Sequence, residues 1–475
     1  MDDIAVSFGT DGWRARGEEF TTRRVEAIGR AVAAYLDDQS AAGDIAVGHD
    51  ARRNSREAAM ALADVLAASG RDVAVPARDC PTPALAWTVA QGPFAGGLMV
   101  TASHNPPEYN GVKFVTDDGA PALPAVTDAL EERLAPPPAR FPTDRAVDGA
   151  EQRDTESQGT IHERALAGPY VDELLGLVDA DLSGLTVAYD AMHGSGRGVT
   201  DTALERAGAT VTRLRCSRDP TFGGVAPEPG PETADGLRSR VGREDGSADI
   251  GLLNDGDADR VGIVTPGRGY LDANVVFAVL YEFLLQRYGA GPVVRSVPTS
   301  SLVDRVAAAA GQQVHETPVG FKWIAAAMVE HGALAGGEES GGYGLTRHLP
   351  NKDGVLVALL ACAAHQEQPL DARIDALRAT HGPVHQDRVS VDCPGDRKED
   401  TVTTLQRDPP ATLAESPVED ISTVDGVKLV LTDGEWLLVR PSGTEPKLRL
   451  YAEAGSRERV DALLAAGREL LERKA

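Results

Sequence analysis

The segment Thr101-Ala102-Ser103-His104-Asn105-Pro106-Pro107 places a serine hydroxyl beside an imidazole. It follows an apolar run at 97–100 that predicts a buried strand, and the two prolines and Asn110-Gly111 predict a turn directly afterwards. In open α/β sheets, ligands and reacting groups lie at strand ends. We therefore interpret Ser103 as a candidate nucleophile, with a plain turn as the alternative.

A second candidate is an acidic loop that holds Asp255, Asp257 and Asp259. It follows an apolar strand predicted at 249–253, and three short carboxylates in a glycine-containing loop can converge on one hard cation. An EF-hand also begins with this spacing, but Arg260 and Pro266 stand where it needs glycine and glutamate. The loop predicts a Mg²⁺ site with a position open for a phosphate oxygen, and an exposed acidic turn is the alternative.

Two further loops offer groups for a sugar phosphate. In the run 336–342, glycines allow close approach to the backbone, and Glu338 and Ser340 can hydrogen-bond adjacent hydroxyls. In the run 440–447, a backbone nest flanked by cations fits a phosphate, with the groups Arg440, Ser442, Gly443, Thr444 and Lys447. Flexible turns without a ligand are the alternative for both loops.

The chain has only seven lysines, which makes each of them informative. Lys113 is predicted on the strand that returns from the Ser103 turn, and burial lowers a lysine pKa toward the range useful for acid–base catalysis. A solvated strand lysine is the alternative. Lys322 falls in the first turn of a predicted helix, where the dipole disfavours cations, which indicates an anionic partner. Arg14 closes a glycine-rich loop that begins at Phe8.

The elements expected around these loops alternate between helices and strands. Helical patterns at 21–36 and 55–69 enclose a strand at 44–48, and two similar units follow. From Asp387 the pattern becomes rich in strands and ends with a helix at 457–472. We expect three consecutive α/β layered domains plus a C-terminal α+β domain, with the ranges 1–150, 160–262, 263–372 and 380–475. The polar, proline-rich stretch from Ala135 to about Gly159 is predicted to be a linker or a long surface excursion.

Composition limits the possible partners. The net charge of −25 disfavours binding to nucleic acid and to anionic membranes. The sequence has no apolar run of about 18 residues and no basic-then-apolar N-terminus, so we expect a cytoplasmic protein. The acidic residues are dispersed, a composition typical of a protein in a high-salt cytoplasm, where salt screens self-repulsion. We therefore predict a halophilic source.

Four motifs, in this order, resemble the signature loops of the α-D-phosphohexomutases, the phosphoglucomutase/phosphomannomutase family: T-A-S-H-N-P, D-G-D-A-D-R, G-E-E-S-G-G and R-P-S-G-T-E-P. The resemblance covers essentially the whole chain. It implies four domains around a central cleft, the last of them with a TATA-box-binding-protein-like fold. It also implies interconversion of hexose 1-phosphate and hexose 6-phosphate through a phosphoserine and a hexose 1,6-bisphosphate, which acts as intermediate and activator.

The resemblance implies roles for individual residues. The phosphoserine position is matched by Ser103, and the Mg²⁺ ligands would be a phosphoserine oxygen with Asp255, Asp257 and Asp259. The sugar hydroxyls would be held by Glu338 and Ser340, and the non-reacting phosphate by Arg440, Ser442, Gly443 and Thr444. The positions near the transferring phosphoryl group are matched by Arg14, His104, Lys113 and Arg260, and either His104 or Lys113 is the general base. Lys322 matches the lysine of the phosphoglucomutase-like branch.

Three positions bear on the identity of the sugar. Phe321 stands where bifunctional bacterial members resembling phosphomannomutase usually have histidine, and Glu339 and Gly342 differ from the pattern of the glucosamine-type members. These departures favour glucose phosphate as substrate, while mannose and glucosamine phosphates stay open. A phosphatase that uses the same serine and metal is an alternative, but it gives no purpose to the loops at 336–342 and 440–447. A non-catalytic sugar-phosphate-binding protein is another, although it needs neither a nucleophile nor three converging carboxylates.

Overall fold

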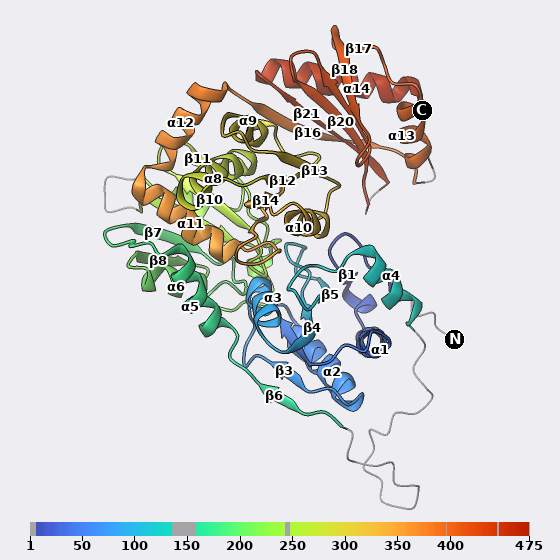
Figure 1. Ribbon diagram of the computed structural model, residues 1–475, viewed down its shortest axis with the longest axis vertical. Helices are drawn as coiled ribbons and strands as arrows, with labels where there is room; N and C mark the ends of the chain where they lie inside the picture. Colours follow the sequence, from blue (N-terminus) through green and yellow to red (C-terminus); the bar gives the residue numbers. More distant parts are fainter. Residues whose placement is uncertain (1–5, 135–157, 243–247, 396, 444–445, 475) are drawn as a thin grey trace, which may run out of the picture. The chain divides into compact units, whose positions relative to one another are not determined.

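The computed structural model describes residues 6–134, 158–242, 248–395, 397–443 and 446–474. The chain divides into two compact units (Figure 1): Met1–Leu271 with Gly342–Glu367 form the first, and Asp272–Gly341 with Gln368–Ala475 form the second. The linker or surface excursion predicted from Ala135 to about Gly159 lies outside the described residues up to position 157. The predicted fold class, three α/β domains followed by an α+β domain, is confirmed.

The first domain is built on a mainly parallel sheet. Its elements are β1 (Trp13–Arg16), α1 (Thr22–Asp38), β2 (Asp44–His49), α2 (Ser55–Ala68), β3 (Val73–Val75), α3 (Thr82–Gln91), β4 (Phe94–Val100), β5 (Tyr109–Val115), α4 (Pro124–Glu132) and β6 (Ile161–Glu163). The strand order is β1-β5-β4-β2-β3-β6, and β5 is antiparallel to both of its neighbours. This order brings the ends of β2 and β4 together, since the two strands are parallel neighbours.

Both faces of this sheet are covered by helices. Ile45 and Val47 join the core that contains residues of α1 and α2, whereas Ala46 of the same strand joins a second core with Leu85 and Val89 of α3. Side chains alternate between the two faces of a strand, so apolar residues at successive positions require a cover on each face. The near-continuous apolar sequence of β4 has the same explanation.

The second domain carries the acidic loop on a hairpin. Its elements are α5 (Ala167–Val178), β7 (Thr186–Asp190), α6 (Thr200–Arg206), β8 (Thr210–Leu214), α7 (Asp235–Arg238), β9 (Ile250–Asn254), β10 (Val261–Thr265) and β11 (Gly269–Tyr270), with sheet order β11-β10-β9-β7-β8. β9 and β10 pair antiparallel, with Asn254 opposite Val261. The loop 255–260 therefore closes a hairpin between two buried strands.

The first unit is completed by a segment that comes much later in the chain. This segment contains β15 (Tyr343–Leu345) and α11 (Gly354–Glu367). α11 packs against α5, α6, β9 and β10, and its residues from Gly354 to Ala364 are all buried. A helix that is enclosed on all sides is apolar all round, which accounts for its sequence.

The second unit begins with the third α/β domain. Its elements are α8 (Ala273–Tyr288), β12 (Val293–Ser296), α9 (Leu302–Ala309), β13 (Val314–Thr317), α10 (Phe321–Glu330), β14 (Ala335–Gly337) and α12 (Leu370–His381). β12 lies between β13 and β14 and is parallel to both. The carboxyl end of β13 leads into the start of α10, which holds Lys322, and the carboxyl end of β14 leads into the loop that holds Glu338.

The C-terminal domain is an antiparallel sheet covered by helices. Its elements are β16 (His385–Asp392), α13 (Lys398–Arg407), β17 (Thr412–Leu413), β18 (Ser416–Ser422), β19 (Val427–Leu431), β20 (Trp436–Pro441), β21 (Lys447–Ala454) and α14 (Arg457–Lys474), with strand order β16-β21-β20-β19-β18-β17. α13 and α14 pack on the face that holds Leu429 and Val439. Trp436 and Leu438 point to the opposite face and meet Val297 of the third domain.

Two general properties follow from the described residues. None of the helices that the structure describes is long and apolar enough to cross a membrane. The cysteines Cys80, Cys216, Cys362 and Cys393 all carry free thiols.

Candidate active site

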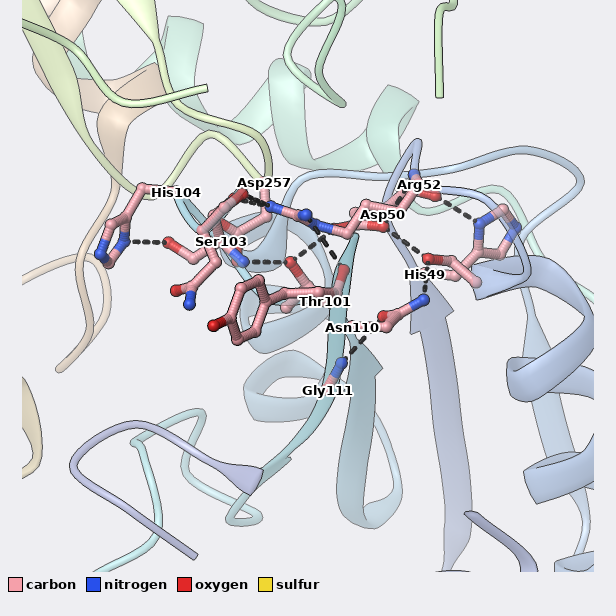
Figure 2. Close-up of polar contacts among 12 residues, drawn as sticks. His49, Asp50, Arg52, Thr101, Ser103, His104, Asn110, Gly111 and Asp257 are labelled. Atoms are coloured by element: carbon pink, nitrogen blue, oxygen red, sulfur yellow. Dashed lines mark hydrogen bonds and ion pairs between the residues drawn. The ribbon is translucent and has the colours of Figure 1, made fainter. Parts of the chain in front are cut away.

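Ser103 lies in the loop between β4 and β5 and is fully buried. Its backbone is in the left-handed region, with φ of 50°. The Oγ atom donates a hydrogen bond to Asp255 Oδ2 at 2.8 Å. It also lies 3.3 Å from His104 Nδ1, the contact drawn in Figure 2. The serine predicted from the first motif and the first aspartate of the acidic loop are thus in direct contact across 152 residues of sequence.

The acidic loop brings its three carboxylates together. One oxygen from each of Asp255, Asp257 and Asp259 lies within 4.8 Å of the other two, and all three residues are buried. Thr82, the first residue of α3, holds Asp257 twice: its amide donates to the Asp257 carbonyl at 2.9 Å, and its Oγ1 donates to Asp257 Oδ2 at 2.6 Å. The convergence that was predicted from the spacing is therefore present.

Gly256 shows how closely the acidic loop approaches the serine loop. A Cβ atom at this position would lie 2.5 Å from the carbonyl oxygen of Ser103. A real Cβ atom does not come that close to a backbone oxygen, so any larger residue would have to push the two loops apart. The glycine is needed here for close approach and not for its backbone angle.

Two lysines and a further aspartate surround the carboxylates. Lys113 Nζ lies 2.9 Å from Asp11, 3.1 Å from Asp257 and 3.0 Å from Asp259. Lys352 Nζ lies 3.1 Å from Asp259 and 3.3 Å from Asp11. Sequence reasoning assigned no role to Asp11 or Lys352. The rarity of lysine in this chain was the available signal for Lys352, which precedes the buried N-terminus of α11.

The environment of Lys113 corrects one expectation. Burial favours the neutral amine, but the charges of Asp11, Asp257 and Asp259 outweigh burial and hold the pKa of Lys113 well above its usual value. The prediction that burial would bring this pKa toward neutral is therefore wrong, because the lysine is buried together with carboxylates. Lys113 is an ammonium group at neutral pH.

His104 has the opposite electrostatics. Burial lowers its pKa well below the usual value, and the positive charges of Arg260 and Arg14 lower it further. The imidazole is therefore neutral at neutral pH. Arg14 itself donates to Asn105 Oδ1 at 2.6 Å, in the same loop as Ser103.

The carboxylates do not share one electrostatic environment. Burial, with repulsion from Asp259 and Asp257, raises the pKa of Asp255 well above its usual value. For Asp259, the two lysines outweigh burial and lower the pKa. Ionisation of Asp255 is thus unfavourable at the Ser103 side of the cluster, and a cation bound there would favour it.

The donor set fits a hard divalent cation. The Oδ1 atoms of Asp257 and Asp259 are buried, and neither accepts a hydrogen bond from the residues that the structure describes. A buried carboxylate oxygen without a partner is costly, and an ion supplies what it lacks. Carboxylate oxygens are also the ligands that Mg²⁺ takes in proteins.

The remaining predicted site residues lie in the second unit. Glu338 follows β14, is buried, and its Oε1 accepts a hydrogen bond from the Gly320 amide at 3.1 Å, next to the start of α10. Lys322 is in the first turn of α10, as predicted, and Ser340 is exposed. Glu338 and the loop before Lys322 are therefore neighbours.

The candidate phosphate loop follows β20. Arg440 Nη2 donates to Asp425 Oδ2 at 2.9 Å, and the same oxygen accepts the Val319 amide at 3.0 Å, which places Arg440 beside the loop before α10. The hydroxyl of Ser442 is buried and has no hydrogen-bond partner among the described residues. Gly443 is exposed, and Thr444 lies outside the described residues.

Family models for four domains match the chain in order. They are described as phosphoglucomutase/phosphomannomutase alpha/beta/alpha domain I (residues 5–137), domain II (168–269), domain III (272–380) and the C-terminal domain (391–470). Together they match most of the sequence.

Curated relatives of similar length carry different names. A protein of Methanopyrus kandleri named probable phosphoglucosamine mutase is 34% identical and aligns over 96% of this chain and 95% of its own length. A phosphoglucomutase/phosphomannomutase of Thermococcus kodakarensis is 30% identical and aligns over 98% of both chains.

Solved structures share the fold. A phosphoglucomutase/phosphomannomutase family protein from Burkholderia thailandensis aligns with a TM-score of 0.84 and 23% identity, covering 100% of this chain and 98% of its own. A more distant match, with a TM-score of 0.60 and 14% identity over 99% and 96% of the two chains, is the Aspergillus fumigatus N-acetylphosphoglucosamine mutase in complex with GlcNAc-6P and magnesium.

Proposed function

We propose a mechanism for this chain on the premise that it belongs to the phosphoglucomutase/phosphomannomutase family, as four domain models matched in order establish. The chain is a phosphohexomutase, an isomerase that acts on sugar phosphates. Ser103 is the phosphoryl carrier in our proposal, and glucose phosphate is the preferred substrate. The 2.8 Å hydrogen bond from Ser103 Oγ to Asp255, beside two carboxylate oxygens that accept no hydrogen bond from the described residues, is the observation that carries the proposal.

Asp255, Asp257 and Asp259 would hold Mg²⁺, with a phosphoserine oxygen as a further ligand. When bound, the ion supplies positive charge to the oxygens of the transferring phosphoryl group. Thr82 keeps one oxygen of Asp257 occupied, which leaves the other for the ion. Lys113 and Lys352 both form ion pairs with Asp259 and hold its carboxylate in place.

The chemistry consists of two phosphoryl transfers. In the first, the bond between phosphorus and Ser103 Oγ breaks, and phosphorus bonds to the free hydroxyl oxygen of a hexose monophosphate, which gives a hexose 1,6-bisphosphate. In the second, the other phosphate of the bisphosphate returns to Ser103. In the first transfer the attacking sugar hydroxyl loses its proton and Ser103 Oγ gains one. In the second, the Ser103 hydroxyl attacks and loses its proton, and the sugar oxygen that leaves phosphorus gains one.

His104 is our candidate for this proton transfer. Its ring is neutral and its Nδ1 lies 3.3 Å from Ser103 Oγ, within the range from which catalytic hydrogen bonds tighten when substrate binds. Lys113 is held as an ammonium by three carboxylates and is poorly suited to accept a proton. We therefore assign Lys113 an electrostatic role and His104 the role of base.

The second unit supplies the groups that recognise the substrate. Glu338 and Ser340 would hold the sugar hydroxyls, and Arg440, Ser442, Gly443 and Thr444 the phosphate that does not react. The buried Ser442 hydroxyl without a described partner supports a ligand at this loop. The bisphosphate must turn over between the two transfers, so these contacts must accept the sugar in both orientations.

The preference for glucose rests on Phe321, Glu339 and Gly342, which depart from patterns typical of mannose- and glucosamine-type members. The relative named as a phosphoglucosamine mutase makes glucosamine phosphate the strongest competitor. Comparing kcat/KM for glucose, mannose and glucosamine 1-phosphates side by side tests the preference. We expect the glucose value to be the highest, and a higher value for either other sugar would overturn the assignment.

The carrier role of Ser103 is tested with Ser103→Ala. With Mg²⁺ and glucose 1,6-bisphosphate present, we expect conversion of glucose 1-phosphate to fall by about 10³-fold or more, because no other group can take up the phosphoryl. Ser69→Ala, at the end of α2, is the control and should keep full activity. Activity that survives in Ser103→Ala would rule out the phosphoserine, and stoichiometric release of inorganic phosphate by the unmutated protein would favour the phosphatase.

A further inference from the structure

The backbone conformation of Ser103 has to be imposed by its surroundings. Its φ of 50° lies in the left-handed region, which is unfavourable for residues other than glycine. Such conformations persist where neighbouring groups over-determine them, and they are often found at active sites. The question is which groups of this chain hold Ser103 there.

Both polar backbone atoms of Ser103 are held by side chains (Figure 2). The amide donates to Thr101 Oγ1 at 2.8 Å, and the carbonyl accepts from Arg52 Nη2 at 2.6 Å. Thr101 and Arg52 are themselves almost completely or completely buried. The peptide units on either side of Ser103 are therefore fixed by groups that do not face solvent.

Arg52 binds the whole serine loop with one guanidinium group. Nη2 also donates to the carbonyl of Asn105 at 2.6 Å, and Nη1 donates to the carbonyls of Pro106 at 2.7 Å and Tyr109 at 3.1 Å. The rigid fork of arginine can hold several acceptors at once, which the single ammonium of lysine cannot reproduce. The ring of Phe222 covers the guanidinium, 4.9 Å from its carbon.

Asp50 connects the two groups that hold Ser103. Its Oδ2 accepts Arg52 Nε at 3.0 Å and the Thr101 hydroxyl at 2.8 Å, and its Oδ1 accepts Ser55 Oγ at 2.7 Å. Asp50 follows β2 and Thr101 follows β4, and these strands are parallel neighbours. The network is thus anchored at the carboxyl ends of two central strands, as Figure 2 shows.

We propose that Arg52, Asp50 and Thr101 form a positioning network that keeps Ser103 in its left-handed conformation, so that Oγ points at Asp255. None of the three is offered as a catalytic residue, because each acts through the backbone of Ser103. The inference rests on the proposed role of Ser103 as phosphoryl carrier. It predicts that substitutions which remove a hydrogen bond of the network slow phosphoryl transfer without weakening substrate binding.

The first test compares Thr101→Val with Thr101→Ser. Valine has the shape of threonine but removes the hydroxyl, whereas serine keeps it. We expect Thr101→Val to lower kcat and the rate of Ser103 phosphorylation by ³²P-labelled glucose 1,6-bisphosphate by about 100-fold, since small misplacements at a reacting centre have effects of this size. KM for glucose 1-phosphate should stay within about two-fold, as expected when binding itself is untouched. Thr101→Ser should restore both rates to within a few-fold.

The second test compares two buried arginines. Arg52→Lys should reproduce the loss seen in Thr101→Val. Arg295→Lys is the control, because Arg295 is a buried guanidinium paired with Asp304 and Glu316 in the second unit. Both variants are expected to lower the melting temperature, but Arg295→Lys should keep the phosphorylation rate of the unmutated protein.

Hydrogen exchange of the peptide that contains residues 101–109 gives a readout that does not depend on the reaction. Thr101→Val should increase exchange in this peptide relative to Thr101→Ser. Unchanged exchange together with an unchanged phosphorylation rate would overturn the network. If Ser103→Ala keeps its activity, the carrier role of Ser103 is overturned. If exchange still rises in Thr101→Val in that case, the network nevertheless holds the backbone of the serine loop.

Discussion

The hydroxyl of Thr82 orients one of the candidate metal ligands, the carboxylate of Asp257. It donates to Asp257 Oδ2 at 2.6 Å and is itself buried, so Thr82→Val removes the hydrogen bond with little change of shape. Groups that orient a metal ligand typically contribute 10- to 100-fold to metal affinity, so we expect Mg²⁺ and Mn²⁺ to bind about 10-fold more weakly. Titration of Mn²⁺ by electron paramagnetic resonance measures this directly, and the Mg²⁺ concentration for half-maximal activity should rise in parallel.

Thr88→Val is the matched control for that prediction. Thr88 lies in the same helix, is equally buried, and donates to the Ala84 carbonyl at 2.8 Å, away from the acidic loop. Its Mn²⁺ affinity should equal that of the unmutated protein. Equal affinities in Thr82→Val and Thr88→Val would show that Thr82 does not orient the ligand.

At the scale of elements, the β9–β10 hairpin must approach the β4–β5 loop without a side chain between them. The Cβ atom introduced by Gly256→Ala would meet the Ser103 carbonyl, so the two loops must separate. A shift of about 1 Å at a reacting centre costs on the order of 100-fold in rate, and we expect a loss of that size in kcat. The coupled assay measures the loss, and circular dichroism should show the fold of the unmutated protein.

Gly176→Ala in α5 is the comparison for this effect. A Cβ atom there meets no described atom within 4 Å, and alanine is a better helix former than glycine. It should leave activity unchanged and raise the melting temperature slightly. If Gly256→Ala were as active as Gly176→Ala, separation of the two loops would not affect catalysis.

At the scale of the whole molecule, the charge of −25 sets the conditions under which the protein is stable. Repulsion between like charges favours expansion, and salt screens it. We predict that raising KCl from 0.1 M to 2 M increases the melting temperature by about 5 °C or more, which corresponds to a gain of at least 1–2 kcal/mol. Differential scanning calorimetry at several KCl concentrations checks this, and a melting temperature that does not rise would exclude adaptation to high salt.

The parts of the site that could be predicted are those encoded within a few residues. The aspartates of the acidic loop occupy alternate positions on one hairpin, and Ser103 follows one strand, so local spacing was sufficient. The contacts of Lys352 and Arg52 could not be predicted because these partners lie far away in the sequence: Lys352 contacts Asp11, and Arg52 contacts the loop that begins at Ser103. Lys113 was identified as a site residue, but the direction of its pKa shift was not predicted, because that direction depends on which charged groups are buried beside it.

The same distinction applies to the fold. The helix predicted at 21–36 is present as α1, and the strand predicted at 97–100 is the last part of β4, because burial on one or both faces leaves a clear pattern. The short strands β1 and β6 and the polar strand β18 were not predicted, because they bury too few side chains to leave such a pattern. α11 falls within the range 263–372 that we expected to form the third domain, but it packs in the first unit. The four predicted domain ranges stay a prediction.

The late segment Gly342–Glu367 has a consequence for the order of events during protein synthesis. Domains commonly fold as they leave the ribosome, N-terminal first. Here the first unit lacks α11 until most of the chain has been translated, so the apolar surfaces of α5, α6 and β9 have no cover at that stage. Lys352, which neutralises Asp11 and Asp259, arrives with the same segment. A chain that ends before Lys352 therefore cannot assemble the complete charge cluster, and catalytic competence requires translation to continue past this residue.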